Sequence, residues 1–136
     1  STYGRGMPKH QERLEAIEWT MALWQKAKAN ADYVAMENPV NVLPVRATQF
    51  VQPYQFGHLE QKKTGFWLHN LPPLIETNNV YEDMMKLPKN KRERLHYLPP
   101  SEDRWRIRST TFSGIADAIA DQWGSYVEQL FKLEGG

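Results

Sequence analysis

The chain of 136 residues contains no cysteine. Without thiols, these residues form no disulfide, no thiolate zinc site and no cysteine nucleophile. The sequence has no apolar run near the roughly 20 residues that a membrane-spanning helix requires, and it does not open on a signal-peptide pattern. We therefore expect a cytoplasmic protein that forms one domain over residues 1–136 and does not enter a membrane.

The formal net charge is only +1, yet basic residues are concentrated between residues 86 and 108. This segment holds eight Lys or Arg residues against three Asp or Glu residues. A basic stretch on a nearly neutral protein indicates an anionic partner, and DNA is the partner we expect. A solvated loop explains the same pattern equally well. The candidate nucleic-acid contacts are Lys89, Lys91, Arg92, Arg94, Arg104, Arg106 and Arg108.

Apolar side chains at helical spacing predict a helix over residues 9–29 and a second helix capped by Ser113. Short apolar runs between them predict three strands, at residues 33–36, 48–53 and 64–69. A helix followed by a continuous apolar strand is typical of α/β proteins with a parallel sheet. We expect an α/β fold with a small three-layer sheet and flanking helices. Residues 75–108 are predicted to form a long basic excursion, with a short helix at 80–86.

Glu37 is the first candidate site residue, because it follows the apolar strand predicted at residues 33–36. Ligands of open α/β sheets bind beyond the carboxyl ends of the strands. There a carboxylate accepts from an exocyclic amine or, when protonated, donates to a ring nitrogen. Pro39 is expected to hold Asn38 extended and so to fix the loop. The alternative is a strand-ending turn with a solvated Glu37.

A second polar cluster, a candidate pocket wall, contains Gln52, Tyr54, Gln55 and His58. The four histidines are scattered and have no companions at metal-ligand spacing, so we expect no metal site. A lone histidine such as His58 is more often structural than a general base.

Two further patterns precede and open the last helix. In an extended chain, Arg104, Arg106 and Arg108 would share one face, with Trp105 and Ile107 on the other. Such a face suits phosphate contacts, and a charge-protected edge strand is the alternative. Small residues then lead into the helix, whose backbone N–H groups favour a polar or anionic ligand unless they serve only for capping. These residues are Thr110, Thr111, Ser113 and Gly114.

Four stretches together resemble a known family. VAMENPV (residues 34–40) resembles the strand-plus-Glu-Asn motif of C5-cytosine DNA methyltransferases. VQPYQFGH (51–58), KKTGFWLHNLPPL (62–74) and RSTTFSGIADAIADQWG (108–124) are similar to a phage and prophage group of methyltransferase-like proteins. The resemblance covers residues 9 to 124.

The resemblance implies a Rossmann-like, S-adenosylmethionine-dependent DNA methyltransferase, in the host-cell cytoplasm if it is phage-encoded. The family's catalytic Glu, which contacts a flipped cytosine, corresponds to Glu37, with Asn38 holding the loop. Its final motif, at the cofactor pocket, corresponds to Thr110, Thr111, Ser113 and Gly114. Flipping is needed because the target atom is inaccessible inside the duplex.

The departures limit this expectation. Neither the Gly-rich cofactor loop nor the Pro-Cys nucleophile motif has a counterpart here, and Pro39 stands where the family usually has valine. We expect the C-terminal portion of such a protein, incomplete for catalysis, whose site a second chain or self-association completes. The alternatives are a non-catalytic nucleic-acid-binding module and an assembly protein whose polar clusters are structural.

Overall fold

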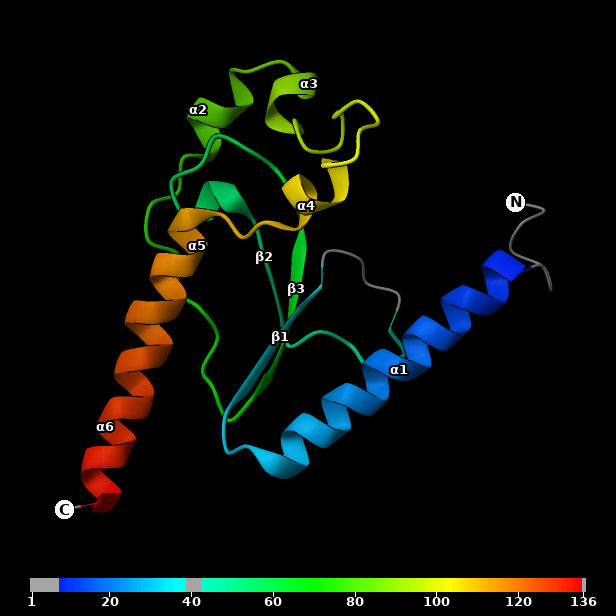
Figure 1. Cartoon of the computed structure of the whole chain (residues 1–136). Coiled ribbons are helices and arrows are strands. Elements are labelled where there is room, and N and C mark those ends of the chain that lie inside the picture. The colour runs from blue at the N-terminus through cyan, green and yellow to red at the C-terminus, as the bar shows by residue number, and fades with distance from the viewer. Residues whose placement is uncertain (1–7, 39–42, 136) are drawn as a thin grey trace.

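The computed structural model describes residues 8–38 and 43–135. They form a small sheet, helices on both of its faces and a group of short helices at one end (Figure 1). The elements are α1 (Pro8–Asn30), β1 (Val34–Asn38), β2 (Gln49–Val51), the 3₁₀-helix η2 (Pro53–Gln55), β3 (Thr64–His69), α2 (Tyr81–Met85), α3 (Lys89–Arg92), α4 (Arg104–Ser109), α5 (Ser113–Ala118), the π-helical segment η3 (Ile119–Trp123) and α6 (Gly124–Gly135).

The sheet has the order β1-β3-β2, and both pairings are antiparallel. The three predicted strands and the mixed helix-and-strand class are confirmed, but the parallel sheet is wrong. The described strands therefore do not show a Rossmann-like arrangement. Because β3 lies between the outer strands and opposes both, β1 and β2 run in the same direction. β2 is shorter than predicted because Pro53, which cannot donate to a ladder, begins η2.

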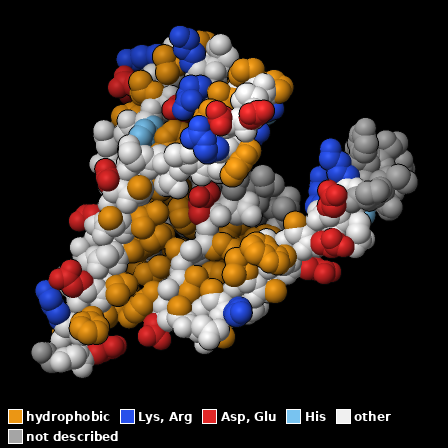
Figure 2. All heavy atoms as spheres, in the orientation of Figure 1, with side chains coloured by type: hydrophobic (Ala, Val, Ile, Leu, Met, Phe, Trp, Pro, Cys, Tyr) orange, Lys and Arg blue, Asp and Glu red, His pale blue; other side chains and the backbone are white. Residues whose placement is uncertain are grey.

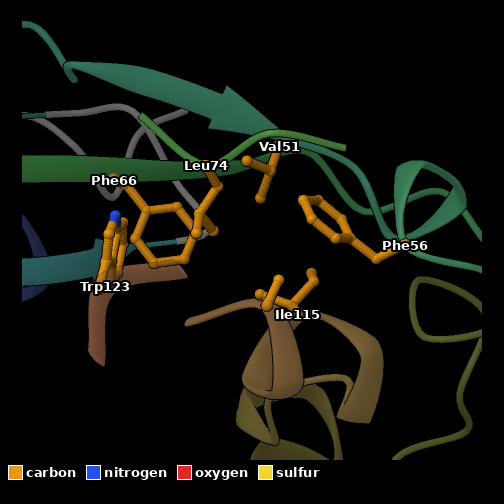
Figure 3. Packing of buried hydrophobic residues seen from close by; sticks show 7 residues of the cluster. Val51, Phe56, Phe66, Leu74, Ile115 and Trp123 are labelled. Atoms are coloured by element: carbon orange, nitrogen blue, oxygen red, sulfur yellow. The ribbon is translucent and has the colours of Figure 1, made fainter. Parts of the chain in front are cut away.

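Alternation along β3 explains how the sheet is covered on both faces. Phe66 packs in a cluster with α5 and η3, whereas Trp67 packs against Trp24 of α1. Successive strand residues point to opposite faces, so these neighbours anchor two separate cores. Figure 3 shows Phe66 beside Trp123, with Val51 of β2, Phe56 just after η2 and Ile115 of α5 converging on the same cluster. Helices therefore cover both faces of the sheet, and the apolar run predicted at residues 33–36 belongs to the edge strand β1 and not to a parallel central strand.

The C-terminal helix is confirmed, with one correction at its start. Phe112 is the N-cap residue and Ser113 is the first helical residue, so Ser113 does not cap the helix. α5, η3 and α6 follow one another in a single run along one side of the sheet (Figure 1). In η3 the Trp123 indole Nε1–H donates to the Pro72 carbonyl at 2.6 Å, which ties this helix to the segment leaving β3. Figure 2 shows hydrophobic side chains gathered between α6 and α1.

Residues 75–108, predicted as a long basic excursion, contain the short helices that lie at one end of the sheet (Figure 1). The predicted short helix is confirmed as α2, and Met84 and Leu95 are buried beneath this region. Arg104, Arg106 and Arg108 lie in α4, so the extended alternation is wrong. In a helix, residues four apart share a face, so Arg104 and Arg108 lie on one side of α4. Arg106 is two positions from each of them and therefore points to the other side.

Candidate functional site

Glu37 lies within β1, directly opposite Phe66 of β3, not in the loop after the strand. Side chains of directly opposed residues share one face of an antiparallel pair, so Glu37 faces the α5 side of the sheet. Partly buried and exposed residues alternate along β1, so the strand is not buried as predicted. Asn38 is its last residue, and the loop that Asn38 and Pro39 were expected to fix lies outside the described residues.

A narrow hollow joins Glu37 to the segment before the last helix. Thr64 and Phe66 of β3 line it on the sheet side, and Thr110 and Thr111, which precede α5, line the opposite side. Two of the predicted groups, the Glu37 motif and the helix-start threonines, are thus brought together. The hollow offers only about 20 Å³, room for a single water molecule. Glu37 itself remains exposed, so its carboxylate also meets molecules outside the hollow.

Lys62 is the site residue that sequence reasoning missed. It lines the same hollow, and its ammonium donates a hydrogen bond to the Arg108 carbonyl. Its backbone N–H donates to the Gln52 side chain at 2.8 Å, which holds the approach to β3 in place. The signal was available in the period-two pattern Lys62-x-Thr64-x-Phe66, which places all three on the Glu37 side.

Desolvation and charge act in opposite directions on this pair. Burial raises the pKa of Glu37, and the positive charge of Lys62 partly offsets that rise. Burial lowers the pKa of Lys62, Glu37 raises it, and the charge of Arg108 lowers it further. Both groups are shifted toward their neutral forms, as expected where a charged group loses water. A carboxyl with a raised pKa is better able to donate a hydrogen bond near neutral pH.

Lys62 also lines a second, larger hollow of about 490 Å³ on the far side of Arg108. Its size is within the range of pockets that bind small molecules. The floor includes the buried Leu95, and one wall is Trp105, whose side chain is 73% exposed. His96 and the Arg108 side chain complete the rim. This hollow combines an accessible aromatic face with cationic groups.

The predicted polar pocket wall serves mainly to shape a turn. Gln55 accepts the Gln52 backbone N–H at 2.8 Å, so both amides bond to backbone groups. His58 Nε2 accepts the Gly114 backbone N–H at 2.9 Å, which ties the turn to the first turn of α5. Tyr54 packs edge-on against Tyr81 and lines a different hollow.

The basic residues differ in how the fold uses them. Arg92 donates to the Leu87 carbonyl and the Gln61 side chain, and Arg94 bonds both carboxylate oxygens of Glu60. Exposed ion pairs join Lys89 to Glu93 and Arg106 to Asp103. Within the part of the chain that the structure describes, the side chains of Lys91, Arg104 and Arg108 make no ion pair, and the buried Arg104 Nε has no hydrogen-bond partner. Figure 2 shows Lys and Arg side chains gathered over α2, α3 and α4.

The residues expected to hold S-adenosylmethionine do not fit it by themselves. The hollow at Thr110 and Thr111 is far too small, and the Gly114 N–H is already bonded to His58. A neighbouring hollow of about 210 Å³ also includes both threonines, but Arg94 is its only charged residue. Ser113 is exposed at the helix start.

The comparisons with known proteins find no match: no family model, no curated protein and no solved structure is significantly similar to this chain. Among residues 8–38 and 43–135, no three His, Asp or Glu side chains are grouped to hold a metal ion. No helix in those ranges has both the length and the apolar character to cross a bilayer.

Proposed function

We propose that this chain is the DNA-contacting, C-terminal portion of an S-adenosylmethionine-dependent cytosine DNA methyltransferase-like protein of phage type. One observation carries the proposal. Glu37 and the threonines of the family's last motif, 73 positions apart, line one hollow, beside a larger hollow with aromatic and cationic walls. The resemblance implies that one motif contacts the target base and the other closes the cofactor pocket, so their proximity supports the proposal.

Glu37 has the chemistry to read a cytosine. An ionised carboxylate accepts from the exocyclic amine, and a protonated one donates to the ring nitrogen. The raised pKa of Glu37 favours the second role. Since the hollow has room for no more than a water molecule, a base would contact Glu37 from outside the hollow or displace residues 110–112. A base reaches this position only from a single strand or after flipping out of a duplex.

Methyl transfer is not a property of these residues alone. The sequence has no cysteine to attack the ring, and the residues proposed for the cofactor are too few to hold it. S-adenosylmethionine remains the proposed cofactor, supplying the methyl group when bound. A second chain, or another copy of this one, would complete its site. A Rossmann-like sheet also belongs to the proposal and would need parallel neighbours beyond the antiparallel pairs that β3 makes with β1 and β2.

Calorimetric titration tests the proposal. The full chain is titrated with S-adenosylmethionine and S-adenosylhomocysteine, each alone and with cytosine-containing DNA. We expect DNA binding that weakens with salt, because phosphate contacts release counterions. We expect cofactor binding to need DNA or a partner chain. A chain that binds neither cofactor in any combination loses the cofactor assignment, and one that also ignores DNA loses the whole proposal.

A non-catalytic nucleic-acid-binding module is the second candidate, favoured by the Lys and Arg side chains over α2, α3 and α4. This function needs neither cofactor nor Glu37. Charge reversal at Arg104, Arg106 and Arg108 would then abolish binding, while Glu37→Gln would leave it unchanged. The methyltransferase-like function instead predicts that Glu37→Gln alters base preference while phosphate binding persists.

A further inference from the structure

The 490 Å³ hollow has features that neither the family's motifs nor the Glu37 site explains. It lies between α4, the segment after α3 and the approach to β3. Its lining includes an exposed indole, a buried aliphatic floor and three groups that carry or can carry positive charge. The six principal residues are Gln61, Lys62, Leu95, His96, Trp105 and Arg108.

Trp105 is the first part of the argument. Trp105 is 73% exposed and lines the hollow from α4. An exposed indole face at a hollow offers a stacking platform for a base. Leu95, only 5% exposed, supplies an apolar floor beside it.

The charges are the second part of the argument. The Arg108 guanidinium makes no ion pair or hydrogen bond among the described residues, whereas Lys62 is oriented by the Arg108 carbonyl. Two cations thus meet at one rim, with His96 nearby. A planar guanidinium without an internal partner is suited to bind a phosphate through two hydrogen bonds.

Glu93 is the acidic residue of the lining, and its ion pair with Lys89 at 4.0 Å partly neutralises it. Carboxylate and amide groups at this wall, Glu93 and Gln61, offer hydrogen-bond partners for the edge of a base. A purely anionic ligand would not use Trp105 and Leu95, and a purely apolar one would leave Arg108 desolvated without a partner. The combination fits a planar, hydrogen-bonding ring that carries a phosphate.

We infer that this hollow is a nucleotide-binding site, in which a nucleobase stacks on Trp105 while Arg108 and Lys62 bind its phosphate. The site is separate from the Glu37 hollow, and Lys62 lies between the two. A nucleotide in this site neighbours the one read by Glu37 in a single strand. The inference rests on the nucleic-acid part of the proposed function, but it needs neither cofactor nor methyl transfer.

Tryptophan fluorescence and calorimetry with the full chain test the site. The probes are cytidine and adenosine monophosphates, a short single-stranded oligonucleotide and inorganic phosphate. Trp105→Ala should weaken binding on the order of tenfold or more, as expected when a base loses its stacking platform, and Trp105→Phe should weaken it less. Trp19→Ala is the matched control, because Trp19 is 68% exposed on α1.

Arg108→Gln should weaken binding and reduce its salt dependence, whereas Arg13→Gln, at an exposed position of α1, serves as the charge-matched control outside the hollow. If the wild type binds both monophosphates and the oligonucleotide and Trp105→Ala binds neither, the site accepts free nucleotides. If the wild type binds only the oligonucleotide and Trp105→Ala loses that binding, the site is specific for strands. The inference is overturned if the wild type binds none of these ligands, or if Trp105→Ala and Trp19→Ala weaken binding equally. Inorganic phosphate that competes as well as a nucleotide also overturns it.

Glu37→Gln distinguishes this site from the proposed function. Trp105→Ala should weaken monophosphate binding by the same factor in the Glu37→Gln background as in the wild type, because Trp105 and Glu37 line different hollows. If monophosphates bind with the expected dependence on Trp105 but Glu37→Gln does not change the base preference, only the proposed function fails.

Discussion

The backbone N–H of Gly114 donates a hydrogen bond to Nε2 of His58 at 2.9 Å, which joins the turn after η2 to the first turn of α5. The His58 ring also contacts the Phe112 ring, with 5.0 Å between centroids. Residues 110–112 thereby gain a fixed end beside the Glu37 hollow. His58 is a structural acceptor here, and the bond requires that its Nε2 carry no proton.

Gly114→Ala is expected to destabilise the protein strongly. A Cβ at this position would come within 2.2 Å of the Phe56 carbonyl oxygen and 2.8 Å of His58 Nε2. Because a backbone atom must move, we expect a loss of roughly 1–3 kcal/mol or more in the free energy of unfolding, measured by urea denaturation. Gly124→Ala is the control, since a Cβ there meets nothing within 4 Å. It should be neutral or stabilising by about 0.5–1 kcal/mol. Equal effects of the two changes would contradict the packing at Gly114.

Gln49→Ala is expected to loosen the segment that follows β3. The Gln49 amide donates to the Leu74 carbonyl at 2.7 Å and accepts the Leu74 N–H at 2.8 Å. Loss of this pair leaves partly buried backbone groups without partners and costs roughly 1–3 kcal/mol of unfolding free energy. Gln122 makes the same two bonds to Ile75 at a more exposed position, so Gln122→Ala should cost less. The reverse order in denaturant titrations would refute this ranking.

The raised pKa of Glu37 predicts a specific pH dependence of stability. As pH rises past the ordinary glutamate pKa, the unfolded chain releases its proton while the folded chain retains it, so stability falls. The loss is complete above the raised pKa. Glu37→Gln should remove this decline and leave the variant more stable at neutral pH, by no more than about 1 kcal/mol because the group is solvent-exposed.

Thermal unfolding of wild type and Glu37→Gln between pH 3 and 8 measures this effect. Glu18→Gln removes the same charge from an exposed position on α1 and corrects for net charge. If the melting temperature of Glu37→Gln changes with pH in the same way as that of the wild type, burial does not perturb this carboxyl.

Periodicity predicted the elements better than their pairing. Helical spacing identified α1 and the C-terminal helix, because long amphipathic patterns have few alternative explanations. The apolar run at residues 33–36 predicted a buried strand of a parallel sheet, but β1 is a partly exposed edge strand that pairs antiparallel with β3. Strand direction depends on which distant segments pair, and a local apolar pattern does not determine it.

Local charge patterns were the least informative part of the sequence. Alternation of Arg with Trp105 and Ile107 suggested a strand, yet the Asp103 carbonyl accepts the Ile107 N–H at 2.9 Å in a short helix. Lys62 was overlooked because its role depends on Glu37 and Arg108, which are distant in sequence. The resemblance assigned Glu37 to the target base and the two threonines to the cofactor, and in the structure all three line one small hollow.

Base preference tests the central proposal, that Glu37 reads cytosine, most directly. The measurement compares dissociation constants for two single-stranded oligonucleotides that differ only in a central cytosine or thymine, with wild type, Glu37→Gln and Glu18→Gln. The account predicts that wild type and Glu18→Gln prefer cytosine by roughly tenfold, the value of one good base contact, and that Glu37→Gln loses this preference. Equal affinity of the wild type for both oligonucleotides, or an undiminished preference in Glu37→Gln, would contradict it.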